Sequence, residues 1–292
     1  MVSYDPKDWF VFIFRLQRSD TFRRLLPLLG VMAVYAWGVA WLEIEYWKLG
    51  ENSHVKNVTV MHTLLGFVIS FTLVFRTNTA YERWWEGRKL WGALVNNSRN
   101  LAIKLSAILP ADHPDRVFFR GTIPAYAQVL KYHLGAEGTR IELFDNLPEE
   151  VERDLDKSRH LPNQVAMQLM NRIVQLRKAG VVTDADWLFL NPELQSFTDI
   201  CGACERIRNT PIPFSYSSFI KKFIFVYVVT LPFGFVFSLG YLVVPIVVFI
   251  FYVLASLELI AEEIEEPFGG DENDLPLGKI AHNIRVHIGE LI

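Results

Sequence analysis

Three long runs without a charged residue most constrain how this 292-residue chain can fold. Residues 25–42 and 58–75 each come close to the ~20 apolar residues that a helix needs to cross a bilayer. Residues 223–257 are too long for one comfortable span, and they carry Pro232, Ser238 and Gly240, where the chain can fold back. The pattern predicts an all-α membrane protein with four transmembrane helices, the last two joined by a tight turn at the sequence SLGY.

Composition indicates that these spans are joined to a substantial water-facing part. Hydrophobic residues make up 51% of the chain and charged residues 21%. The formal net charge of −3 gives no reason to expect nucleic-acid binding. Two cysteines cannot form a disulfide framework, so other forces must hold the fold together.

The placement of lysine and arginine predicts the orientation of the spans. Basic residues gather before the first span, after the second and before the third, whereas the first outer connection holds only two lysines and the second none. By the positive-inside rule, both termini are therefore cytoplasmic. The basic residues on the predicted cytoplasmic side are Arg15, Arg18, Arg23, Arg24, Arg76, Arg83, Arg88, Lys89, Lys221 and Lys222.

Five segments follow from this topology. Residues 1–22 have charges ahead of a short apolar stretch, which argues against a signal peptide and favours an interfacial helix. A helix packed on the protein's own core is an equal alternative for this segment. Residues 23–76 hold helices 1 and 2, residues 77–221 a cytoplasmic helical domain, residues 222–260 helices 3 and 4, and residues 261–292 an acidic loop with a C-terminal helix. Apolar spacing of three and four in 83–109, and a basic turn ending at Gly180 in 162–180, predict the cytoplasmic helices.

Phe67, Phe71 and Phe75 form a stripe along one side of the second span. This stripe could face lipid, pack against a neighbouring span, or line a pore. Small polar residues and a carboxylate share this face, and they favour a pore because polar side chains are poorly suited to contact with lipid. They are Thr63, Ser70, Asn78 and Glu82. Symmetric copies of the helix around an axis would then form an apolar neck between wetter chambers, of the kind that gates by dewetting.

Five stretches in order along nearly the whole chain resemble the bestrophin family. They are DWFVFIFR, LLGFVISFTLVFR, AYERWWEGRKLWG, CERIRNTPIPFSY and AEEIEEPFGGDENDLPL. The resemblance implies a homopentameric channel with one axial pore in a bacterial inner membrane, passing anions such as chloride. It also implies that Phe67, Phe71 and Phe75 are the neck positions. A cytoplasmic aperture is expected near the GVVTDADW turn, and Ala185 is its predicted narrowest point.

The acidic stretch after the fourth span resembles the calcium-binding loop of calcium-activated family members. Asp271 and Asp274 match acidic ligand positions, whereas Glu263 and Glu266 stand where amide or backbone oxygens would serve. Asn273 interrupts the acidic run. A Ca²⁺ site, which takes about six to eight oxygens, is one interpretation. A solvated acidic turn before the next helix is the other.

Other functions are weighed against the channel. Cys201 and Cys204 form a lone CxxC pair, and His160 and the other histidines lie far from it at no ligand spacing, so metal or redox chemistry is not predicted. No Ser/His/Asp order, HExxH pair or Gly-rich phosphate loop indicates an enzyme. A cation-selective channel of the same fold is the closest alternative, and a membrane-bound enzyme or redox-linked scaffold is the alternative from another class.

Overall fold

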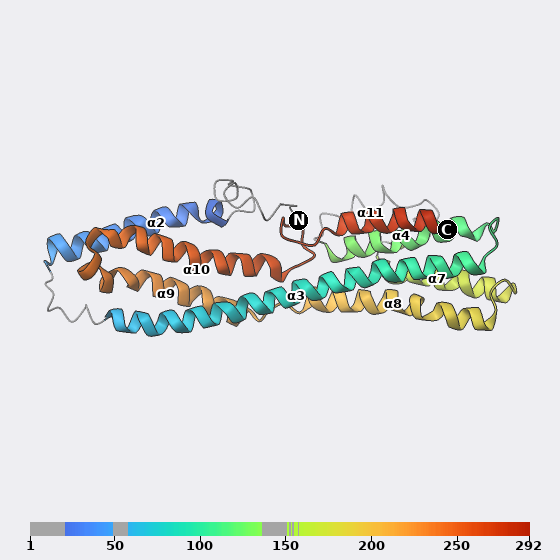
Figure 1. The fold of residues 1–292 in the computed structure, drawn as a ribbon, viewed down its shortest axis with the longest axis horizontal. Helices are drawn as coiled ribbons and strands as arrows, with labels where there is room; N and C mark the ends of the chain where they lie inside the picture. Colours follow the sequence, from blue (N-terminus) through green and yellow to red (C-terminus); the bar gives the residue numbers. More distant parts are fainter. Residues whose placement is uncertain (1–20, 49–57, 136–150, 152, 154, 157) are drawn as a thin grey trace. The chain divides into compact units, whose positions relative to one another are not determined.

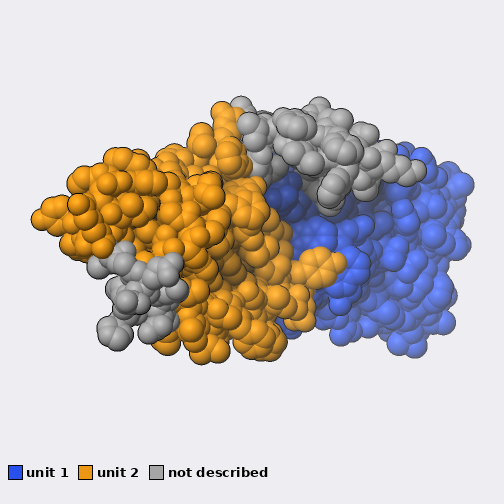
Figure 2. Space-filling view, turned by 60° about the vertical axis from the view of Figure 1, so that its left-hand side comes forward, with its two compact units in different colours: residues 1, 83–211, 266–292 blue, residues 2–82, 212–265 orange. Residues whose placement is uncertain are grey.

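The computed structural model describes residues 21–48, 58–135, 151, 153, 155–156 and 158–292 (Figure 1). Within these residues every regular element is a helix, which confirms the predicted all-α class. The predicted interfacial segment 1–22 lies outside the described residues except for its last two positions. The helices form two compact units, coloured separately in Figure 2. Unit 1 holds Arg83–Pro211 and Glu266–Ile292, and unit 2 holds Val2–Glu82 and Ile212–Glu265, in their described parts.

Unit 2 contains the long apolar helices. They are α2 (Thr21–Trp41) with the π-helical turn η1 (Leu42–Tyr46), residues 58–82 of α3 (Val58–Ile108), α9 (Phe214–Leu239), η4 (Gly240–Leu242) and α10 (Val243–Glu265). Helix α2 packs against α10 and α9 (Figure 1). Their shared core is apolar and includes Met32, Ala36, Ile69, Leu73, Ile224, Leu231, Val243 and Val247.

Three stretches in the described chain are long and apolar enough to cross a membrane: Thr21–Tyr46, Val58–Ile108 and Phe214–Glu265. Large apolar side chains such as Val34 and Phe249 remain exposed on unit 2, as expected for helices that face lipid. The protein is therefore a membrane protein.

The third stretch is divided at Gly240, which has a φ of +54° and ends α9. A positive φ is accessible to glycine without steric cost, so the predicted turn sequence is suited to this break. Helices α9 and α10 pack against each other (Figure 1). Both helices extend beyond the uncharged run of residues 223–257. Lysines near the start of α9 and glutamates near the end of α10 end the uncharged run but do not end the helices. The number of membrane crossings stays a prediction.

Helices α3 and α9 approach closely at Gly234. A Cβ atom placed there would lie 2.9 Å from the Thr59 hydroxyl oxygen and 3.1 Å from the Thr59 backbone nitrogen. The Thr59 hydroxyl donates to the Gly234 carbonyl at 3.0 Å. The small residue thus allows backbone contact between two helices of the apolar unit, as is common in membrane proteins.

Unit 1 is a helical unit with a large apolar core. It contains residues 83–108 of α3, α4 (Asp115–Leu134), α7 (Leu161–Lys178), α8 (Asp184–Asn209) and α11 (Leu277–Leu291). Helix α4 packs against α11, α7 and α8 (Figure 1). The core is mainly aliphatic with several aromatic side chains, and the Tyr126 hydroxyl donates to the Phe197 carbonyl at 2.6 Å.

Local capping fixes where α7 and α8 begin. The His160 side chain accepts from the Asn163 backbone N–H at the start of α7. Thr183 and Asp186 form a reciprocal capping box at the start of α8. Gly180, with a φ of +78°, follows α7 as the sequence pattern predicted.

Cys201 and Cys204 are buried on α8 with free thiols. Burial raises the pKa of each thiol to about 12. Both therefore behave as small apolar groups, which agrees with the interpretation of the CxxC pair as structural.

Candidate functional site

The phenylalanine stripe lies on the exposed side of α3. Phe67, Phe71 and Phe75 are 73%, 57% and 53% exposed in the single chain. The Phe67 and Phe71 rings are nearly parallel, with an interplanar angle of 14° and centroids 6.2 Å apart. The Phe71 and Phe75 rings meet edge to face at 4.7 Å. The stripe is thus a continuous column of aromatic rings along one helix.

The opposite side of the same helix faces the core of unit 2. Ile69 and Leu73 are each 2% exposed, and Arg76 is 1% exposed. At 100° per residue, these three positions lie roughly opposite the phenylalanines around the helix axis. Packing of the stripe into the described core of unit 2 is therefore excluded. Among the described residues the stripe is therefore left open to lipid, to the water of a pore or to another copy of the chain.

The polar residues predicted to share the stripe are also exposed. The hydroxyls of Thr63 and Ser70 donate to carbonyls of their own helix, at Thr59 and Gly66, with distances of 3.1 and 2.8 Å. Bonded in this way, they place small polar surface beside the rings without an unsatisfied group. Asn78 and Glu82 are exposed further along the helix.

Arg76, the charged residue that directly follows the stripe, points away from the face of α3 that carries the rings. The Arg76 guanidinium is buried between two glutamates of α10, with Nη2 2.8 Å from Glu265 and Nε 3.5 Å from Glu258. The other Glu265 oxygen accepts from the backbone N–H of Ile212 at 2.7 Å. Arg76 therefore anchors α3 to α10 and contributes no charge to the face that carries the rings. The sequence analysis counted Arg76 among the cytoplasmic basic residues and did not predict its partners, which lie far along the chain.

The acidic loop before α11 is organised around Asp274. Its Oδ2 accepts from the backbone N–H groups of Gly270 and Asp271, each at 2.5 Å. Burial raises the pKa of Asp274, and these two hydrogen bonds act against that rise. The loop also packs on α3, because the Trp84 indole donates to the Asn273 carbonyl at 3.1 Å. The WWEG and PFGGDEND stretches of the family resemblance thus meet in unit 1.

The predicted calcium ligands were tested against this geometry. Asp274 Oδ1 is buried and has no hydrogen-bond partner within the described residues. Asp271 and Glu266 are exposed, and Glu263 belongs to unit 2, where it pairs with Arg24. Asp274 Oδ1 is thus a buried carboxylate oxygen open to a ligand, whereas Ca²⁺ takes about six to eight oxygens. The calcium site stays a prediction, and the turn interpretation accounts for the observed bonds.

Ala185, the predicted aperture residue, is exposed in the first turn of α8. Its neighbours Leu188 and Phe189 are also exposed, at 72% and 53%. The structure of one chain places no second copy beside this end of α8, so the aperture stays a prediction.

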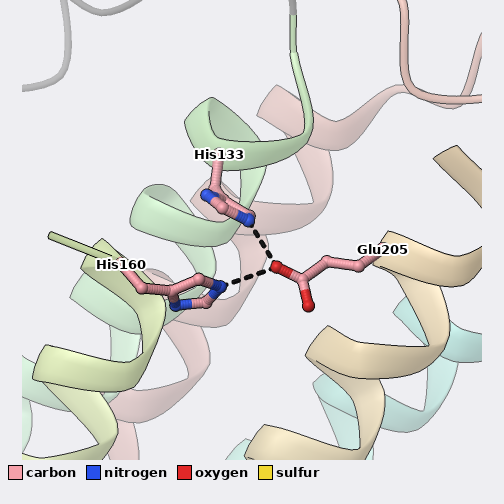
Figure 3. Close-up of side chains that lie close together, drawn as sticks. All are labelled: His133, His160 and Glu205. Atoms are coloured by element: carbon pink, nitrogen blue, oxygen red, sulfur yellow. Dashed lines mark hydrogen bonds and ion pairs between the residues drawn. The ribbon is translucent and has the colours of Figure 1, made fainter. Parts of the chain in front are cut away.

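A second cluster was missed by sequence reasoning. His133, at the end of α4, and His160, at the start of α7, both contact Glu205 of α8 (Figure 3). Each Nε2 lies 2.6 Å from the same Glu205 oxygen. Sequence reasoning set the histidines aside because they lie far from the CxxC pair, whereas three separate helices bring His133, His160 and Glu205 together. No short-range spacing could have indicated this cluster.

The chain matches a known family over nearly its whole length. The model of the family described as "Bacterial/Fungal Bestrophin protein" matches residues 1–290. A voltage-dependent anion channel-forming protein of Synechocystis is 30% identical over 99% of this chain and 94% of its own length. A protein of the same description from Nostoc is 31% identical over 98% of this chain and 92% of its own.

Solved structures agree with this match. A crystal structure of a bacterial bestrophin homologue from Klebsiella pneumoniae superposes with a TM-score of 0.81 at 30% identity. The alignment covers 93% of this chain and 98% of the homologue.

Proposed function

Because this chain belongs to the bacterial and fungal bestrophin family, we propose that it is a passive, pentameric channel for anions such as chloride. Relatives named as anion channel-forming proteins support a channel rather than an enzyme. In the proposed assembly, five copies place Phe67, Phe71 and Phe75 around one axis as the neck.

The observation that carries this proposal is the exposed aromatic column. Its rings lie opposite the face of α3 that packs into unit 2, so the column is free to face an axis. Three rings per chain give an apolar constriction a little over two helical turns long, since Phe67 and Phe75 are eight residues apart. Ring edges attract anions and ring faces attract cations, so the edge-to-face contact of Phe71 with Phe75 offers both surfaces.

Cation selectivity is the second candidate, and Glu82 favours it. This carboxylate is exposed on the same face of α3 as the rings. Five copies would form a ring of carboxylates, and rings of this kind select for cations in cation channels. The membrane is proposed to be the bacterial inner membrane, with four crossings and both termini cytoplasmic.

A reversal potential tests the selectivity. Purified protein in a planar bilayer is recorded across a KCl gradient. A potential near the chloride equilibrium value supports the anion channel. A potential near the potassium value, moved towards chloride by Glu82→Gln, would establish the second candidate instead.

The neck is tested by truncating its rings. The triple variant Phe67→Ala, Phe71→Ala and Phe75→Ala is expected to raise single-channel conductance, because it widens the constriction. Phe249→Ala is the matched control, since Phe249 is 64% exposed on α10 and lies off the stripe. Equal currents from both variants would indicate that the stripe faces lipid.

The mass of the purified particle tests the assembly. It should be about five times the 33.7 kDa mass of the chain, and a monomer would contradict the assembly.

A further inference from the structure

Unit 1 contains one cluster of side chains with the composition of a metal centre. His133, His160 and Glu205 each offer one ligand atom, and the three atoms lie within 4.8 Å of one another (Figure 3). No other group of His, Cys, Asp or Glu side chains in the described residues meets this condition. The channel proposal does not use it.

We propose that His133, His160 and Glu205 form a binding site for a transition-metal ion, with Zn²⁺ as its preferred occupant. Two imidazoles and one carboxylate are a donor set that binds Zn²⁺ in proteins, and they leave a fourth position open to water. Imidazole nitrogen favours zinc and its neighbours in the transition series over Mg²⁺ or Ca²⁺.

The observed distances are compatible with the coordination of such an ion. Zinc bonds to nitrogen and oxygen are about 2.0–2.2 Å, so ligand atoms around a tetrahedral ion lie about 3.3 Å apart. Each histidine Nε2 is now 2.6 Å from Glu205 Oε1. Each contact would therefore widen by less than about 1 Å, which small side-chain rotations can provide. The imidazole centroids are already 4.4 Å apart, with a tilt of 55°.

The cluster is accessible to a cation. The three side chains are 25–33% exposed, so an ion can reach them from solvent.

Metal binding would be coupled to the start of α7. His160 Nδ1 accepts from the Asn163 N–H at 3.2 Å, so its Nε2 carries the hydrogen that points at Glu205. A metal on Nε2 requires the hydrogen to move to Nδ1, which ends that acceptor role. Binding of the ion would break the hydrogen bond that caps α7 and would join α4, α7 and α8 through metal–ligand bonds.

Zinc titration of the full-length protein in detergent tests the site. Protein treated with a chelator and exchanged into metal-free buffer is titrated with ZnCl₂ by calorimetry, and bound zinc is counted per chain. Glu205→Gln keeps the shape of the side chain and removes its charge. His160→Asn removes the imidazole but keeps an oxygen that can cap α7. His282→Gln is the matched control, because His282 is exposed on α11 and does not belong to the cluster.

The expected result is one Zn²⁺ per chain for the wild type and for His282→Gln. Glu205→Gln and His160→Asn should each weaken binding by more than about 100-fold, beyond the loss that an outer-shell partner causes. Co²⁺ should show the visible bands of a tetrahedral site in the wild type and in His282→Gln, and in neither of the other two variants. Equal binding by all four proteins would show adventitious surface sites and overturn the proposal. Absence of binding to the wild type would overturn it too, leaving a hydrogen-bonded cluster. Binding is measured without current, so this result is independent of channel activity.

Discussion

Replacing Arg76 with methionine should strongly destabilise the apolar unit. Arg76 is 1% exposed and lies between Glu258 and Glu265. Both Glu258 oxygens are buried and have no hydrogen-bond partner among the described residues, so the guanidinium charge is what compensates them. Methionine keeps most of the volume of arginine and removes the charge. The variant therefore isolates the electrostatic role of this residue.

The expected loss follows from the burial of the three groups. Removing one partner of a buried ion pair costs about 3–5 kcal/mol, because the remaining charge stays buried and uncompensated. A loss of about 4 kcal/mol lowers the Tm of a chain of more than about 150 residues by roughly 10 °C. Arg24→Met is the matched control. Arg24 also pairs with a glutamate of α10, Glu263, but its side chain is 51% exposed, and exposed pairs contribute about 0–1 kcal/mol.

Thermal unfolding in detergent, at one fixed scan rate, distinguishes the two variants. Arg76→Met should melt far below the wild type, whereas Arg24→Met should remain within about 3 °C of it. Adding Glu258→Gln and Glu265→Gln to Arg76→Met should recover most of the loss, because no buried charge then remains. Equal melting of Arg76→Met and Arg24→Met would refute the reasoning, and so would a triple variant that is no more stable than Arg76→Met.

Two further predictions concern the packing of each unit. Gly234→Ala should lower stability by about 1–3 kcal/mol in the same melting assay, because the new Cβ meets the Thr59 backbone, which cannot move away as a side chain can. Gly289→Ala has open space at its Cβ on α11 and should be neutral or stabilising, so equal losses would contradict this account. Cys201 and Cys204 should resist iodoacetamide at pH 8 until the chain is unfolded. With a pKa of about 12, only about one thiol in 10⁴ is ionised at that pH, and rapid labelling of the folded protein would show that α8 opens.

The helices and the ring column could be predicted from the sequence because both depend on local order. An uncharged run of bilayer length favours a helix wherever it lies in the chain, and a spacing of four residues keeps side chains on one face. The break at Gly240 was predictable for the same reason, since glycine tolerates the positive φ of that turn. The family could be recognised because five motifs keep their order along the chain. The start of α9 and the end of α10 were not predicted, because an uncharged run stops at the first charged residue whereas the helix continues past it.

The sequence by itself determined that the chain is helical, apolar enough to span a membrane, and marked by an aromatic stripe on its second long helix. The tertiary structure decided what each side of that helix contacts. Arg76 was visible as a charge, but its burial against α10 depends on packing between helices distant in the chain. Likewise, His133, His160 and Glu205 meet only because α4, α7 and α8 pack together. A helical repeat fixes neighbours three or four residues apart, whereas contacts between helices depend on how their surfaces fit.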